Sequence, residues 1–265
     1  MARIYICFVT SNISTHLKQK IRSVDLAFTG IFTAFVAAAT MTLSVFIAAT
    51  GGFFNIGEIM VYTTALLMGP IIGAFAAGVG SMIADVSLGY AVFAPGTLII
   101  KGAEAFIVGY VSRHRPSGLT KTNWRILSAV TGFIIGLAIW LLGTSLYVGK
   151  MELSLGLPGI GYTNLNLFVP ELLWMILAVV AVIVTLVVGF SVEAEVGWWI
   201  ISIILGGIIM VTGYFLYETL ILGQVGAILE IPFNFMQLTI GLIVSIPLYK
   251  SVLRILPKYR ISKLD

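Results

Sequence analysis

The feature that most constrains this chain is a series of long apolar runs, separated by short stretches that carry nearly all of its charges. Most of these runs approach the roughly 20 residues that an α-helix needs to cross a bilayer. The composition agrees, since 59% of the 265 residues are apolar and 10% are charged, against about 25% charged in soluble domains. The runs do not alternate as the strands of a membrane β-barrel would. The sequence therefore predicts an all-α, polytopic helical membrane protein, with residues 1–265 forming a single transmembrane domain.

We predict about eight membrane segments from these runs. The second segment holds about 12 residues and would rise only about 18 Å as a helix, so it could enter the membrane partway and stop at the Gly69–Pro70 break. The segments are 26–49, 58–69, 70–89, 95–112, 126–148, 168–190, 197–218 and 232–253.

The basic residues predict the orientation. All but two of the 15 Lys and Arg residues fall in the N-terminal tail, in the region 113–125 or in the C-terminal end. Lys and Arg gather on the cytoplasmic side of membrane proteins. Eight crossings put these three regions on one side, so both termini are predicted to be cytoplasmic. Basic loops that face anionic lipid headgroups also explain the net charge of +4, so no nucleic-acid partner is expected.

Two of the predicted helices carry small residues at every fourth position, which places them on one face. Such a row lets another helix approach closely. The rows are Gly30, Ala34, Ala38 and Thr42 on the first helix, and Gly69, Gly73, Ala77 and Ser81, ending at Asp85, on the third. Each row could pack inside the bundle or dock a separate membrane subunit, and periodicity does not choose between these interpretations.

A lysine lies within a predicted span, where an ionisable side chain costs about 2.5–3.5 kcal/mol unless it has a partner or a purpose. Lys101 lies six residues after Pro95, about 9 Å below the outer end of its helix. Glu104 follows at i+3 and could form an ion pair with Lys101. Alternatively, Lys101 faces a cavity that holds a polar or anionic ligand. Both interpretations remain open from the sequence.

Further polar residues converge on the outer ends of several spans, with aromatic residues in the neighbouring outer loops. Planar rings can stack on a heteroaromatic ligand while a few polar groups orient it. This combination predicts a ligand pocket that opens to the exterior. The candidate binding residues are Phe53, Phe54, Asn55, Glu58, Asp85, Tyr90, Phe93, Lys101, Glu104, Tyr214, Glu218, Glu230, Asn234 and Gln237.

Six motifs, in order along the chain, resemble a known family. They are Asn55–Tyr62 (NIGEIMVY), Leu66–Gly73 (LLMGPIIG), Gly78–Asp85 (GVGSMIAD), Pro95–Gly102 (PGTLIIKG), Gly213–Glu218 (GYFLYE) and Glu230–Gln237 (EIPFNFMQ). These motifs are similar to those of the S components of energy-coupling factor (ECF) vitamin transporters, in the riboflavin-type branch. The stretch from Ala34 to Ala38 also matches the AxxxA pattern that S components present to their membrane-coupling subunit.

The resemblance covers roughly 24–112 and 197–255, and family members usually have six spans. It therefore implies a six-helix core, with 126–190 as an inserted helical hairpin whose outer loop runs over 149–167. It also implies a subunit that binds a water-soluble vitamin from outside, with riboflavin first and hydroxymethylpyrimidine or a pyridine vitamin as alternatives. The subunit would dock through Gly30, Ala34 and Ala38 on a transmembrane T subunit with two ATPases, in the plasma membrane of a prokaryote, topple in the membrane and release its ligand inside.

Two other classes of protein are weighed against this interpretation: a membrane-embedded enzyme and a stand-alone secondary transporter. Enzymatic acid/base chemistry could use Asp85, Glu104 or Glu218, but the sequence has no HExxH or GxSxG motif. No internal repeat of the kind common in secondary transporters is evident. The sequence also lacks a GxxxxGK[ST] phosphate loop, so ATP hydrolysis would come from a partner. With the single cysteine Cys7 and only two histidines, no metal site, disulfide or cofactor is expected.

Overall fold

The computed structural model describes residues 23–47, 50–118, 120–157 and 161–255. Within these described ranges, seven helices are long and apolar enough to cross a bilayer, and α3, with 11 residues, is not. The chain is thus a polytopic helical membrane protein, and the helical prediction is confirmed. The α-helices are α2 (Ser23–Thr42), α3 (Glu58–Met68), α4 (Pro70–Leu88), α5 (Ala94–Arg113), α6 (Lys121–Leu146), α7 (Glu171–Ser191), α8 (Ala194–Leu216) and α9 (Ile231–Ile255).

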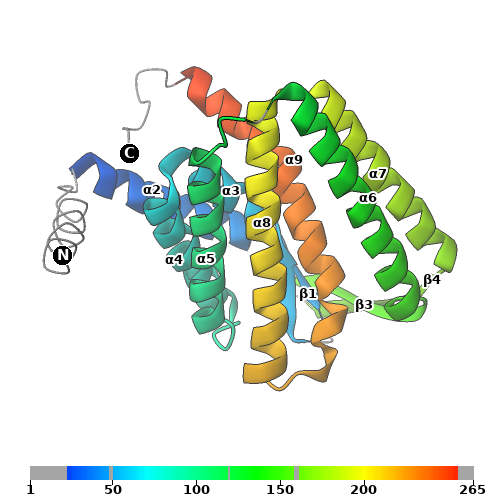
Figure 1. Cartoon of the computed structure of the whole chain (residues 1–265). Helices are drawn as coiled ribbons and strands as arrows, with labels where there is room; N and C mark the ends of the chain where they lie inside the picture. The colour runs from blue at the N-terminus through cyan, green and yellow to red at the C-terminus, as the bar shows by residue number, and fades with distance from the viewer. Residues whose placement is uncertain (1–22, 48–49, 119, 158–160, 256–265) are drawn as a thin grey trace, which may run out of the picture.

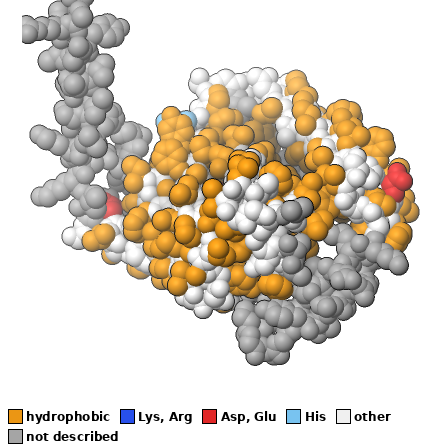
Figure 2. Space-filling view, turned by 90° about the horizontal axis from the view of Figure 1, so that it is seen from below, with side chains coloured by type: hydrophobic (Ala, Val, Ile, Leu, Met, Phe, Trp, Pro, Cys, Tyr) orange, Lys and Arg blue, Asp and Glu red, His pale blue; other side chains and the backbone are white. Residues whose placement is uncertain are grey.

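The surface of the bundle is apolar, and several ionisable side chains lie inside it. Ile71 and Ile99 are 72% and 71% exposed, whereas Glu104 is fully buried. Hydrophobic side chains also occupy much of the surface in the view from below (Figure 2). A soluble monomer rarely exposes apolar patches of this extent. This distribution fits a chain whose solvent is lipid.

Helices α2, α3, α4, α5, α8 and α9 pack on one another, while α6 and α7 pair with each other at one side of the bundle (Figure 1). The interior at α3 contains Val61, Tyr62 and Ala65, all at most 1% exposed. Gly206 of α8 brings α5 close, because an added Cβ would lie 2.9 Å from the backbone oxygen of Glu104. Apolar packing of this kind, with small residues at the crossings, is typical of membrane bundles.

A β-hairpin explains why the second membrane segment is short. Strands β1 (Ser44–Ile47) and β2 (Gly52–Asn55) pair antiparallel, and every residue of β2 is buried in the bundle. After β2, α3 begins beside Lys101 and ends beside Arg113, whose guanidinium donates to the backbone oxygen of Leu67 at 3.2 Å. Lys101 and Arg113 are 12 residues apart, or about 18 Å along α5. The hairpin therefore fills one half of the bundle and α3 the other.

The all-α prediction is wrong for two segments. The apolar run 26–49 ends as a helix at Thr42 and continues into β1. The expected outer loop 149–167 is a second antiparallel hairpin, formed by β3 (Gly149–Leu157) and β4 (Gly161–Val169). Both strand sequences alternate polar and apolar residues, as in KMELSL and NLNL, which is the period of a strand. Pairing also satisfies backbone groups that a loop would leave without partners.

The pair α6–α7 touches the rest of the bundle at few points. Along its length, α6 presents glycines to α7: a Cβ on Gly136 would lie 2.5 Å from Val182. At one end the ring of Trp124 packs on Gly197, and at the other the hydroxyl of Tyr147 donates to the backbone oxygen of Ile228. The hairpin expected over 126–190 is therefore present as a helix pair. Its status as an insertion remains a prediction.

Candidate functional site

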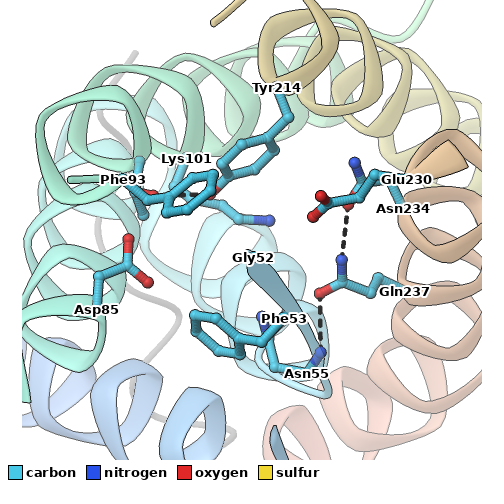
Figure 3. Close-up of a pocket in the computed structure, with 11 residues that line it drawn as sticks. Gly52, Phe53, Asn55, Asp85, Phe93, Lys101, Tyr214, Glu230, Asn234 and Gln237 are labelled. Atoms are coloured by element: carbon cyan, nitrogen blue, oxygen red, sulfur yellow. Dashed lines mark hydrogen bonds between the residues drawn. The ribbon is translucent and has the colours of Figure 1, made fainter. Parts of the chain in front are cut away.

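A cavity lies between the β1–β2 hairpin and helices α4, α5, α8 and α9 (Figure 3). We call this end of the bundle, which carries both β-hairpins and the α4–α5 loop, the hairpin end (Figure 1). The space between the side chains that line the cavity is about 350 Å³, counting the part that is open to solvent. Its lining residues are Gly52, Phe53, Asn55, Asp85, Phe93, Thr97, Lys101, Tyr214, Glu230, Asn234 and Gln237.

Lys101 lies in the wall of this cavity and is 4% exposed. Its ammonium group donates to the carboxylates of Glu58 and Glu104, the latter at 3.2 Å. Glu104 also accepts a hydrogen bond of 2.8 Å from the hydroxyl of Tyr62. The two interpretations of Lys101 are therefore compatible, because it lines a cavity and is paired. The expectation of a simple Lys101–Glu104 pair is incomplete, since Glu58 from α3 is a second partner.

Helix α9 forms the opposite wall and holds the first hairpin in place. The side chain of Gln237 donates to Asn234 at 2.8 Å and accepts from the backbone N–H of Asn55 at 3.2 Å (Figure 3). Nearby, the hydroxyl of Thr50 donates to Glu230. Asn234 and Gln237 are each 3% exposed, so both face the interior of the bundle. These hydrogen bonds hold the N-terminal end of α9 against the loop and strand that cover the cavity.

Aromatic rings form part of the lining. Phe53 of β2 stacks on Tyr90 with ring centroids 4.4 Å apart and an angle of 26°. On the opposite side, the ring of Tyr214 lies 5.5 Å from the ammonium nitrogen of Lys101. The hydroxyl of Tyr214 donates to Thr97 at 3.0 Å. A flat ligand would therefore meet the rings of Phe53, Phe93 and Tyr214, which line the cavity (Figure 3).

Three acidic groups near the cavity have carboxyl oxygens without hydrogen-bond partners among the described residues: Glu58, through its Oε2 atom only, Asp85 and Glu218. Asp85, 3% exposed, points its carboxylate into the cavity from the end of α4, and its Oδ2 atom has no partner there (Figure 3). Glu218 is fully buried on the π-helical turn η1 (Tyr217–Ile221) that extends α8. Neither of its carboxyl oxygens has a partner in the described part of the chain.

The structure brings most of the predicted binding residues to this cavity. Glu58 and Glu104 lie beside it as partners of Lys101, and Tyr90 lies beside it as the partner of Phe53. Glu218 and Phe54 do not line it, and Phe54 pairs with Val45 in the β-ladder. The predicted residues that line it are Phe53, Asn55, Asp85, Phe93, Lys101, Tyr214, Glu230, Asn234 and Gln237.

Sequence reasoning missed Gly52, Thr50, Tyr62 and Thr97. Thr97 could have been found, because it lies four residues before Lys101 and so shares its helix face. Tyr62 likewise follows Glu58 by one helical turn. No local pattern marks Thr50, whose contact with Glu230 depends on how the hairpin folds back on α9.

The two rows of small residues have opposite environments. The row on α4 is buried, and a Cβ on Gly80, next to it, would lie 2.6 Å from the backbone oxygen of Thr33 on α2. On α2, Gly30, Ala34 and Ala38 are exposed, and a Cβ on Gly30 would meet nothing within 4 Å. The described residues of the chain therefore leave the α2 row uncovered.

A helical membrane bundle with an aromatic-walled polar cavity defines a membrane protein suited to hold a small molecule. Comparison with protein families identifies the family within this class. Residues 20–157, just over half of the chain, match the model of the ECF-type riboflavin transporter S component. The chain belongs to this family, which is one of transporter components and not of enzymes. The match covers α2 to α6 and β3 and stops before α7.

A curated protein of Pyrococcus woesei, described as "Uncharacterized protein in gap 3'region", is similar to part of the chain. The two are 43% identical over 100 residues, which make up 38% of this chain and 64% of that relative. The chain thus spans less than two thirds of the relative's length. The relative's name assigns no activity.

Proposed function

We propose that this chain is the substrate-capture subunit of an ECF importer. It binds a water-soluble vitamin or vitamin precursor at the hairpin end and delivers it to a T subunit driven by two ATPases. The observation that carries this proposal is the cavity, where the hairpin and four helices bring buried polar groups and aromatic faces together. Such a mixture can desolvate a flat ligand and still orient it through a few hydrogen bonds.

Riboflavin is the first ligand to test, because the matching family model carries its name. Hydroxymethylpyrimidine and the pyridine vitamins are the alternatives. All three are flat rings with hydrogen-bonding edges, so ring faces such as Phe53 and Tyr214 suit each of them. The amides of Asn234 and Gln237 and the hydroxyl of Thr97 supply both donors and acceptors for the edges.

The exposed row on α2 supports the partnership with a T subunit. Gly30, Ala34 and Ala38 form a flat strip that a helix of another subunit could approach closely. Bulky side chains flank this strip, including Ile31 and Phe35, which are 49% and 52% exposed. A strip of this shape in lipid gains more from a partner helix than from lipid chains, because two helix backbones can pack tightly there.

Basic residues support an orientation with the cavity outside. Arg113, Arg115, Lys121 and Arg254 lie on segments at the end opposite the hairpins, which we call the basic end (Figure 1). By the positive-inside rule this end faces the cytoplasm of a prokaryotic cell, and both termini lie on that side. The cavity then opens to the exterior, where the vitamin is taken up.

Orientation can be tested by cysteine labelling. In a Cys7→Ser background, an impermeant thiol reagent applied to intact cells should label Lys150→Cys at the hairpin end. It should label Lys121→Cys at the basic end only after the membrane is opened. Equal labelling of both positions in intact cells would contradict the proposed topology.

The function itself can be tested by reconstitution. The full chain, coexpressed with a T subunit and two ATPases from the same genome, should co-purify with them and drive ATP-dependent uptake of radiolabelled vitamin into proteoliposomes. Mass spectrometry of the purified chain should identify the small molecule that stays bound. Uptake that proceeds without ATP and without the other subunits would instead favour a stand-alone secondary transporter.

A further inference from the structure

The region around the cavity contains more acidic than basic side chains. Among the residues that the structure describes, Lys101 is the one buried cationic side chain there, at 4% exposure. The buried acidic residues are Glu58, Asp85, Glu104, Glu218 and Glu230, each at most 5% exposed. A buried charge at membrane depth is costly unless another charge compensates it. This excess of negative charge can be relieved by protonation of the carboxyl groups or by a cation, and a cationic ligand would supply that cation within the cavity.

Lys101 does not supply a free positive charge to the cavity. Its ammonium group already donates to the carboxylates of Glu58 and Glu104. An anionic ligand at Lys101 would compete with both carboxylates and would be repelled by them. The pairing of Lys101 therefore argues against an anionic ligand.

The carboxyl groups that line the cavity lie on opposite walls. Asp85 reaches in from α4, and Glu230 reaches in from the start of α9 (Figure 3). The Oδ2 atom of Asp85 has no hydrogen-bond partner in the described part of the chain, although the side chain is 97% buried. The rings of Phe53, Phe93 and Tyr214 also line the cavity. Aromatic faces attract cations in desolvated sites, so rings and carboxylates favour the same kind of ligand.

We propose that the cavity selects a positively charged nitrogen heterocycle, with its cationic edge between Asp85 and Glu230 and its ring against Phe53 and Phe93. This inference rests on the proposed capture function and names the charge class of its ligand. A cation would compensate carboxylates that a neutral ring leaves unmatched, and hydrogen bonds between charged partners are stronger than those between neutral ones. A neutral flavin would not compensate the negative charge of these carboxylates.

The test compares ligands that differ in charge, and one of the two pairs is also matched in shape. Isothermal titration on the purified full chain in detergent should show 1-methylnicotinamide binding at least about tenfold more tightly than nicotinamide, which lacks only the methyl group and the charge. Thiamine, also a cation, should likewise bind more tightly than riboflavin. Asp85→Asn removes the negative charge and keeps the shape, so it should weaken binding of either cation about tenfold or more and change nicotinamide binding little.

Two further variants complete the test. Glu195→Gln removes an exposed carboxylate far from the cavity and should leave the preference for cations unchanged. Glu230→Gln should reduce this preference as Asp85→Asn does, and it replaces that variant if Asp85→Asn does not fold. The inference is overturned if the neutral member of either pair binds as tightly as the cation, if no cationic probe binds, or if both pocket variants keep the full preference. ATP-driven uptake of riboflavin by the assembled complex would still uphold the capture function.

Discussion

Helices α2 and α4 carry the same sequence signature and use it in opposite ways. Both have small residues at every fourth position, but the row on α4 is buried and the row on α2 is exposed. The helices pack on each other through a different face of α2, which presents Val36, Ala37 and Thr40 to the interior. Small residues at this spacing therefore predict that another helix can approach closely, from the same chain or from a partner. Whether it comes from the same chain depends on which face the rest of the fold covers.

The small residues of α4 also affect the candidate site. Its glycines allow α5 to approach, since a Cβ on Gly78 would lie 2.6 Å from the backbone oxygen of Leu98. This close approach places Lys101 of α5 and Asp85 of α4 around one cavity. The buried face of α4 thus helps to position the candidate site through Gly78, next to the row, whereas the exposed row on α2 is available to a partner. The predictions below test this division.

The largest loss of stability is expected from a substitution at Lys101, in the polar interior of the bundle. Lys101→Met leaves Glu58 and Glu104 buried without their cation, and breaking a buried ion pair costs about 3–5 kcal/mol. Thermal unfolding in detergent should show this loss. The triple variant Lys101→Met, Glu58→Gln and Glu104→Gln removes all three charges and should recover most of the stability. A triple variant as unstable as the single one would contradict the ion-pair argument.

The next effect compares one substitution on the two rows. Gly73→Leu, on the α4 row, would push its side chain against the backbone of Ala65 on α3, and overpacking of this kind costs about 1–3 kcal/mol. Gly30→Leu on the α2 row meets open space and should change the unfolding midpoint little. Similar destabilisation by both substitutions would remove the distinction between the rows.

The exposed row should affect transport and not folding. Ala34→Trp or Ala38→Trp places a large side chain on the strip and prevents close approach of a partner helix. We expect ATP-driven uptake by the complex to fall about tenfold or more, equivalent to about 1.4 kcal/mol. Ligand affinity and thermal stability of the isolated chain should stay near those of the parent. Impaired folding of the isolated chain would favour internal packing of this row.

The sequence predicted the helices because bilayer thickness and hydropathy determine them locally. It also predicted that polar groups such as Asp85 and Asn234 would gather at one end, because their positions along the spans fix their depth. It did not predict that Glu58 would bind Lys101, because this contact joins residues 43 positions apart and depends on how far the β1–β2 hairpin pushes the start of α3 into the bundle.

The strands β3 and β4 were missed for a different reason. Their alternation was visible in the sequence, but a loop between two long spans was expected to lack regular structure. Hydropathy alone therefore described the spans well and the segment 149–169 poorly.

The smallest effect is expected where the α6–α7 pair joins the bundle. The hydroxyl of Tyr147, just past α6, donates to the backbone oxygen of Ile228, and a hydrogen bond of this kind contributes about 1 kcal/mol. Tyr147→Phe should therefore lower the unfolding midpoint by only a few degrees. Tyr110→Phe, at an exposed tyrosine near the basic end, is the matched control and should change the midpoint less.

The pH dependence of this effect sharpens the test. Burial raises the pKa of Tyr147 from its usual 10.0 to about 12, so the hydroxyl remains a donor throughout the neutral range. Because the folded state holds this proton more tightly than the unfolded state does, the contribution is complete below pH 10 and is lost as the pH rises to 12. The stability difference between the parent and Tyr147→Phe should therefore be constant near neutral pH and shrink above pH 10. A difference that grows above pH 10 would show that the hydroxyl is not the donor at this junction.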